Sequence, residues 1–164
     1  MIRPILRFPD PRLRTAAAPV QGFDDALQAL TADLLATMRA APGIGITAPH
    51  VGVAQRLVVI EVDGVHSYVN PRIVWASDDL ARHEEGSVSM PGVSEQIERP
   101  ARVRVEYQTL DGTGQTEHAE GLLAVCLQHE IDQLDGIFWI NRLSRLKRDR
   151  VIKRFEKLQR AAGR

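Results

Sequence analysis

The sequence predicts a single α+β domain that spans residues 1–164. Two observations carry this prediction. Strand-like runs occupy the middle of a short chain, and segments with helical periodicity lie before and after them. The length of 164 residues allows a sizeable core, and the apolar content of 44% and charged content of 26% are those of an ordinary globular protein.

The first forty residues predict an extended arm followed by a helix. Pro9 and Pro11 restrict themselves and the residues before them, so 8–13 should be extended or turn-rich. Asp24 is a good N-cap, and Pro42 with Gly43 should end the helix. The apolar residues of this helix recur at helical spacing and are Leu27, Leu30, Leu34, Leu35 and Met38.

A glycine-bearing loop at 43–52 precedes the expected strands. Alternating or continuous apolar runs indicate strands, and Asp63-Gly64 and Asp111-Gly112 indicate the turns between some of them. The expected strands are 56–62, 66–70, 73–75, 102–108 and 115–120.

Two helices are expected in the last third of the chain. One begins near Leu122 and ends at Asp135-Gly136. The other runs from about Ser144 to Gln159, and its apolar side should consist of Val151, Phe155 and Leu158.

Composition favours a cytoplasmic protein without membrane contact. Cys126 is the sole cysteine, which excludes an internal disulfide framework. The longest apolar stretches, such as 57–60, are too short to span a bilayer, and the N-terminal residues lack the apolar region of a secretory leader.

Charge is distributed unevenly although the net charge is +0. The stretch Arg142–Arg164 holds ten Lys or Arg against two acids, Asp149 and Glu156, and the rest of the chain is correspondingly acidic. A basic segment on an acidic body suits contact with nucleic acid, although such charges commonly form only a solvated helix face.

The segment Gln128–Gln133 contains the residues that first suggest chemistry. In the HExxH motif, histidines at i and i+4 share a helix face and hold one metal, while the glutamate handles the proton of metal-bound water. Here His129 and Glu130 are present, but position i+4 is Gln133. Alone, a His-Glu pair on a helix is more often structural than catalytic.

Two further segments change this interpretation. They are Gly43-Ile44-Gly45 and Glu85–Gly92, and with Gln128–Gln133 they follow one another in a characteristic order and separation. Together they resemble the peptide deformylase family, whose motifs read roughly GxGLAAPQ, EGCLSVPG and QHExDHLxG. The resemblance covers nearly the whole chain and includes the opening at 9–14 and the segment 141–144.

The resemblance implies a fold, an activity and a site. The fold is a set of twisted antiparallel and mixed sheets around a central motif-bearing helix, with a C-terminal helix. The activity is hydrolytic removal of the N-formyl group from formyl-methionine of nascent peptides during protein biosynthesis. In the family, the Cys of the second motif and both His of the third hold Fe²⁺ or Zn²⁺. The family's Gln and a backbone N–H hold the formyl oxygen.

The substrate-binding and catalytic positions carry over one by one. Gly43 and Gly45 match the glycines of the first motif, and His50 replaces the oxygen-holding Gln. The backbone donor falls at Val88, and Glu130 matches the catalytic general base and acid.

The three ligand positions are Ser87, His129 and Gln133, so two of the three ligands have changed. A neutral hydroxyl and a carboxamide are poor ligands for iron or zinc. Without a metal, Glu130 would have to deprotonate ordinary water, whose pKa a metal lowers from about 15.7 to about 7, a difference of roughly 12 kcal/mol. We therefore expect no resident metal, or at most one Fe²⁺ or Zn²⁺, and deformylation that is weak or lost.

Alternatives remain open. Ser87 and Gln133 fit drift at an unused site in a metal-free protein that binds N-terminal peptides or the ribosome. A rebuilt metal site using His50 and His129 would instead serve an N-acyl amide hydrolase. Cys126 lies three residues before His129 on a similar helix face, but we interpret it as a small buried residue.

Overall fold

Two antiparallel sheets form the β part of the computed structural model, which describes residues 1–163. The larger sheet has the strand order β1-β2-β3-β6-β7, and every neighbouring pair in it is antiparallel. Its strands are β1 (Gly45–Thr47), β2 (Leu57–Glu61), β3 (Val65–Ala76), β6 (Arg102–Gln108) and β7 (Gly114–Glu120). The second sheet is a long hairpin of β4 (Leu80–Ser87) and β5 (Met90–Pro100).

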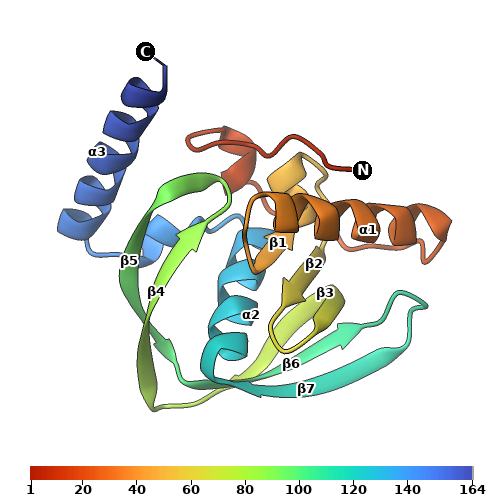
Figure 1. Cartoon of the computed structure of the whole chain (residues 1–164). Coiled ribbons are helices and arrows are strands. Elements are labelled where there is room, and N and C mark those ends of the chain that lie inside the picture. Colours follow the sequence, from red (N-terminus) through yellow and green to blue (C-terminus); the bar gives the residue numbers. More distant parts are fainter. Residues whose placement is uncertain (164) are drawn as a thin grey trace.

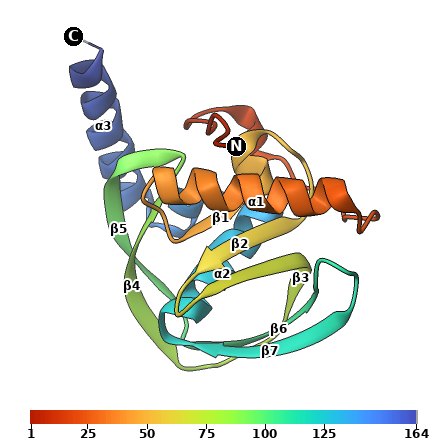
Figure 2. The ribbon, with the colours of Figure 1, turned by 45° about the vertical axis from the view of Figure 1, so that its right-hand side comes forward.

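The helices occupy three distinct places around these sheets. Helix α2 (Gly121–Leu134) lies between the β4–β5 hairpin and the larger sheet, α1 (Asp25–Ala40) crosses beside β1 and β2, and α3 (Arg145–Ala162) stands outside β5 (Figures 1 and 2). Short 3-10 helices cover Pro11–Arg14, Ala48–Val51 and Trp139–Arg142. The expected α+β fold, with sheets around a central motif-bearing helix and a C-terminal helix, is confirmed.

Strand β2 is buried on both faces, which explains its continuous apolar sequence. Val58 and Ile60 pack in the cluster that contains the apolar side of α2, and Leu57 and Val59 pack in the cluster that contains α1. All four side chains are fully buried. The strand therefore joins the two helices into one core, as a strand covered on both faces can.

The first predicted helix agrees with the structure in detail. The Asp24 side chain accepts a hydrogen bond from the Leu27 N–H at 3.0 Å, and α1 begins at the next residue, Asp25. Four of its five predicted apolar residues are buried, and Leu35 is partly buried against them.

Several strand and helix predictions need correction. The runs 66–70 and 73–75 belong to one strand, β3, whose pairing with β6 is irregular and in which Asn70 has a φ of 50°. The β4–β5 hairpin was not predicted, because most residues of β4 are polar or solvent-exposed and show no clear alternation. On α3, Val151 and Phe155 are buried, whereas Leu158 lies on the same side, close to Gly92 of β5, but is 44% exposed.

Within the described residues, no helix has both the length and the apolar character needed to cross a membrane.

The central position of α2 predicts a large cost for truncating its core side chains. Leu127 is fully buried between the sheets. Leu127→Ala should lower the free energy of unfolding by about 2–5 kcal/mol, measured by urea denaturation. The matched control is Leu146→Ala on α3, where the side chain is 64% exposed and the expected change is within about 0.5 kcal/mol. Equal losses in the two variants would contradict this account of the core.

Candidate functional site

A cavity of about 530 Å³ opens where the three sequence segments meet. Helix α2, the end of β4 and the loop before β1 all contribute to its wall. The polar or motif-derived wall residues include Gly43, Gly45, Glu85, Ser87, Val88, His129 and Glu130, and the apolar ones include Ile44, Leu122, Val125 and Cys126. Segments that are far apart in the sequence therefore converge on one site.

Two glycines allow the loop to approach the helix and the hairpin closely. A Cβ at Gly45 would lie 3.0 Å from Glu130 Oε1, and a Cβ at Gly43 would lie 2.7 Å from Val88 Cγ1. Real Cβ atoms rarely make contacts this short, so a side chain at either position would push the loop away. The glycines are thus required by the closeness of the wall.

His129 is oriented by a buried carboxylate. Its Nδ1 lies 2.8 Å from Glu85 Oε1, and Glu85 also accepts hydrogen bonds from Arg99 Nε and Nη2 at 2.6 and 2.9 Å. Burial opposes ionisation of His129, but the hydrogen bond that its Nδ1–H donates to Glu85 and the nearby carboxylates outweigh it and raise its pKa. Because Nδ1 is engaged, Nε2 is the ring nitrogen left for chemistry.

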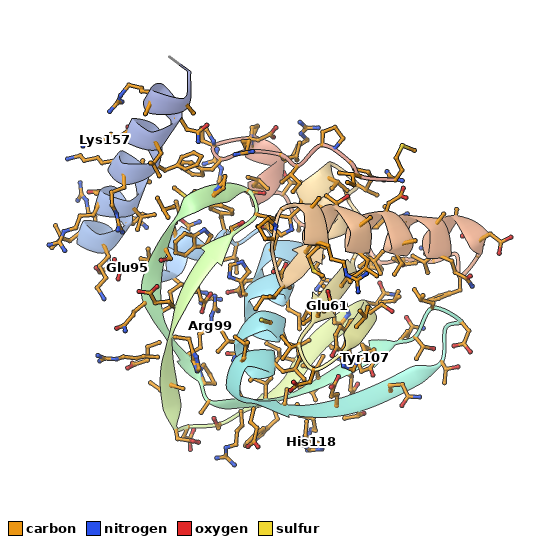
Figure 3. All side chains as sticks on the ribbon, in the orientation of Figure 1. Glu61, Glu95, Arg99, Tyr107, His118 and Lys157 are labelled. Carbon is orange, nitrogen blue, oxygen red and sulfur yellow. The ribbon has the colours of Figure 1, made fainter. Side chains whose placement is uncertain are left out.

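The same network continues along α2. Asp132 lies one turn after His129 and accepts from Arg99 Nη1 at 2.9 Å and from Arg142 Nη2 at 2.7 Å. Figure 3 shows Arg99 between the β4–β5 hairpin and α2. Its guanidinium joins carboxylates on both elements, which fixes the hairpin against the helix.

Glu130 is buried beside His129 without a close partner for one of its oxygens. Burial raises the pKa of Glu130 to about 7. Its Oε1 lies 3.8 Å from His129 Nε2, and Oε2 has no hydrogen-bond partner among the described residues. A carboxyl group in this state can both accept and donate a proton near neutral pH, as a general base and acid must.

His50 is held in a neutral form behind the cavity. The Thr47 N–H donates to its Nδ1 at 2.9 Å, so the ring proton belongs on Nε2. Burial, with a smaller effect from His129, lowers the pKa of His50 to about 3. Nε2 has no partner within residues 1–163, and His50 is not part of the cavity wall.

Gln133 and Ser87 occupy two of the ligand positions of the family, but the polar side-chain atoms of both are hydrogen-bonded to backbone groups. The Gln133 Nε2 donates to the Leu13 carbonyl at 2.7 Å, and Gln133 does not line the cavity. The Ser87 hydroxyl does line it and accepts a hydrogen bond from the Ser89 N–H at 3.1 Å. One carboxamide tied to the backbone and one hydroxyl thus stand where the family has an imidazole and a thiolate.

This donor set does not fit the iron or zinc that the resemblance implies. His129 Nε2 is the one strong ligand among the three positions, because a hydroxyl and a carboxamide bind these metals poorly. In the part of the chain that the structure describes, no group of three or more His, Cys, Asp or Glu is placed to hold a metal ion.

Cys126 does not supply the missing thiolate. Burial, followed by the carboxylates of Glu130 and Glu85, raises the pKa of its thiol to about 12. The thiol therefore stays protonated near neutral pH, which agrees with the interpretation of Cys126 as a small buried helix residue.

Glu85, Arg99, Asp132 and Arg142 were missed as site residues by sequence reasoning. Glu85 carried a weak signal, because it precedes Ser87 by two positions in a motif segment. Arg99 and Arg142 carried none, because each is contributed by an element whose contact with α2 depends on the tertiary fold.

Comparisons with known proteins agree with this geometry. A family model described as polypeptide deformylase matches residues 2–149. A protein of Brucella melitensis named peptide deformylase-like is 64% identical over 162 residues, covering 97% of this chain and 99% of the relative. A protein of Phenylobacterium zucineum named peptide deformylase is 47% identical over 167 residues, covering 98% and 99%. The crystal structure of a peptide deformylase from Legionella pneumophila aligns with a TM-score of 0.94 at 40% identity, covering 100% of this chain and 99% of that chain.

The buried ion network predicts that loss of Arg99 lowers the free energy of unfolding far more than loss of an arginine at the surface. Arg99→Met would leave Glu85 without its buried cation, and the free energy of unfolding should fall by about 3–5 kcal/mol in urea denaturation. The matched control is Arg82→Met on β4, because Arg82 pairs with Glu98 at the surface and such pairs contribute less than about 1 kcal/mol. Similar small losses in both variants would show that the network does not hold the hairpin.

Proposed function

Because the chain belongs to the polypeptide deformylase family, we propose that it binds the N-terminal formyl-methionyl segment of peptides and that its metal-dependent deformylation is weak or lost. The observation that carries this proposal is the hydrogen bond from Gln133 to the Leu13 carbonyl. It ties up the side chain at the third ligand position, which together with Ser87 leaves His129 as the one strong ligand.

Retention of peptide binding is supported by the cavity wall. The apolar side chains of Ile44, Leu122 and Val125 suit a methionine side chain, and the space of about 530 Å³ is within the range of small-ligand sites. The glycines at 43 and 45 keep the loop close enough to contact a bound backbone. In this proposal Gly45 and Val88 bind substrate, and Glu130 is the catalytic residue for any remaining hydrolysis. His50, which the resemblance made a substrate-binding residue, lies behind the wall with its Nδ1 3.9 Å from Glu130 Oε2.

Loss of rate follows from the chemistry of water. Glu130 lines the cavity, where it can accept a proton from a bound water molecule. That water, however, would not be activated by a metal. The missing activation is worth roughly 12 kcal/mol, which one carboxylate cannot replace.

The rebuilt metal site that would use His50 and His129 has less support. His50 lies outside the cavity wall, and its Nδ1 is occupied by the Thr47 N–H. His129 uses Nδ1 for Glu85, so the two imidazoles would supply two nitrogens and no obvious third ligand.

A metal and activity experiment tests the proposal. The wild-type chain, purified anaerobically, should hold far less than one iron, zinc or nickel atom per chain by elemental analysis, and any formate that it releases from a formyl-methionyl peptide should be insensitive to a chelator. Ser87→Cys with Gln133→His should raise metal content toward one atom per chain, because both strong ligands return while Glu85, Arg99 and Asp132 still hold the site. Restored hydrolysis is expected to need His50→Gln as well.

The two single variants, Ser87→Cys and Gln133→His, serve as controls and should each bind metal more weakly than the pair. About one metal atom per wild-type chain after extensive dialysis would overturn the proposal. So would rapid formate release by the wild type that a chelator abolishes. Calorimetric titration with the same peptide tests binding separately from chemistry.

Ribosome contact is a second proposal, favoured by the surface of α3. The helix projects from the body of the protein, and Lys157 points outward from it (Figures 1 and 3). Within residues 1–163, Arg154 is the one basic residue of α3 that pairs with an acid, Glu95 at 3.7 Å. The remaining cations are free to meet phosphates, while Val151 and Phe155 hold the helix on the hairpin side.

Charge reversal on α3 should abolish ribosome binding if that proposal is correct. Lys147, Arg150, Lys153 and Lys157 are exposed and make no ion pair within residues 1–163, so changing them to Glu should preserve folding. Co-sedimentation of the parent with ribosomes should fall steeply as salt rises. Changing the same four residues to Gln should give an intermediate effect. If the parent does not co-sediment with ribosomes at low salt, or if the four-Glu variant co-sediments as well as the parent, the ribosome proposal is wrong. The basic residues of α3 then form only a solvated helix face.

A further inference from the structure

We propose that Ser87 is a nucleophile that accepts an acyl group without any metal, with His129 as its base and Glu85 orienting the imidazole. The site would then carry out serine-based acyl transfer in the cavity where the family places a metal. For its natural substrate, an N-formyl peptide, this inference rests on the proposed function; for the chemistry itself it rests on three side chains of β4 and α2.

The position of Ser87 is fixed by its neighbours on both sides. Two residues before it, Glu85 contacts His129, and one residue after it, Val88 packs on Gly43. Gly43 in turn belongs to the loop whose Gly45 lies against Glu130. Ser87 is therefore held at the end of β4, and it lines the same cavity as His129 and Glu130.

The hydrogen-bonding pattern leaves the reacting atoms available. Glu85 engages Nδ1 of His129 at 2.8 Å, as the acid of a catalytic triad does, so in the neutral imidazole the proton lies on Nδ1 and Nε2 can accept one. The Ser87 hydroxyl accepts from the Ser89 N–H, and its own proton has no acceptor among residues 1–163. Ser87 and His129 make no direct hydrogen bond, but nucleophile–base contacts commonly tighten only when substrate binds.

A donor for the developing oxyanion follows Ser87 directly. Val88 is the first residue of the two-residue turn between β4 and β5, and its N–H makes no hydrogen bond in the described chain. A backbone N–H next to the nucleophile is the arrangement that stabilises tetrahedral intermediates in serine hydrolases.

The formyl group is transferred to Ser87 and then to water. Ser87 Oγ attacks the formyl carbon while its proton moves to His129 Nε2, which gives a tetrahedral oxyanion at the Val88 N–H. The C–N bond then breaks, and His129 returns the proton to the departing amine, leaving a formyl ester on Ser87. Water then attacks the ester carbonyl while Glu130 takes a proton from it. The bond from the formyl carbon to Ser87 Oγ breaks, Ser87 Oγ takes up that proton, and formate is released.

Acylation in the presence of a chelator tests this chemistry directly. The full chain is treated with EDTA, mixed with p-nitrophenyl formate, quenched in acid and analysed by intact mass and peptide mapping. We expect release of p-nitrophenolate and a mass increase of one carbonyl group located on Ser87. Ser87→Ala should abolish the adduct. Ser94→Ala is the matched control and should retain it, because Ser94 lies on the same hairpin outside the cavity wall and donates to Glu84.

Glu85 is a positioning residue in this scheme, and kinetics distinguish that role from a structural one. Glu85→Gln should lower the acylation rate constant by about 10⁴-fold, as loss of the orienting carboxylate does in a serine protease, while the half-saturating ester concentration stays unchanged. Should this variant unfold, Ser87→Cys in EDTA provides a second test, since a thiolate with the same base should give a thioester at position 87.

The outcomes separate this inference from the proposed function. The assignment of Ser87 as the nucleophile is overturned if the adduct persists in Ser87→Ala or requires added metal. It is also overturned if the wild type forms no adduct. Peptide binding without acylation by either formyl peptide or ester overturns it as well and leaves the proposed function standing. Acylation by the ester without binding of the peptide supports the nucleophile and overturns peptide binding.

Discussion

The interaction on which the site depends is the bridge that Arg99 makes between Glu85 on the hairpin and Asp132 on α2. It joins two elements that belong to different parts of the sequence and have little apolar contact at this point. Glu85 is also hydrogen-bonded to Nδ1 of His129. The Arg99 guanidinium, by fixing Glu85, therefore fixes the orientation of the His129 imidazole. A buried cation shared by two carboxylates has few alternative arrangements, so the geometry is well defined.

This support explains how a deformylase-family site can lose two ligand types and keep its shape. The network lies behind His129 and is complete without a metal, since each carboxylate has an arginine partner. The residues that changed, Ser87 and Gln133, contact backbone groups instead. The cavity can therefore support other chemistry. The Ser87 hydroxyl and the oriented His129 imidazole, which share its wall, would react differently from a metal-bound water.

Sequence reasoning predicted the elements whose signals are local. The Asp24 cap, the apolar face of α1 and the strands around Asp63-Gly64 and Asp111-Gly112 depend on neighbours within a few residues. The β4–β5 hairpin escaped prediction because its strands are stabilised by their pairing and by α2 and α3, not by an alternating pattern. The turning of Gln133 toward Leu13 was equally invisible, because that contact joins residues 120 positions apart.

The burial of β2 on both faces has a consequence for how this protein can vary. A strand with one wet face tolerates polar substitutions at every second position, but Val58 and Val59 face different helices and neither meets solvent. Divergence should therefore be slow in β2 and fast in β4, where most side chains are solvated. Substitutions of the exposed side chains of β4 should therefore cost the fold less than substitutions in β2.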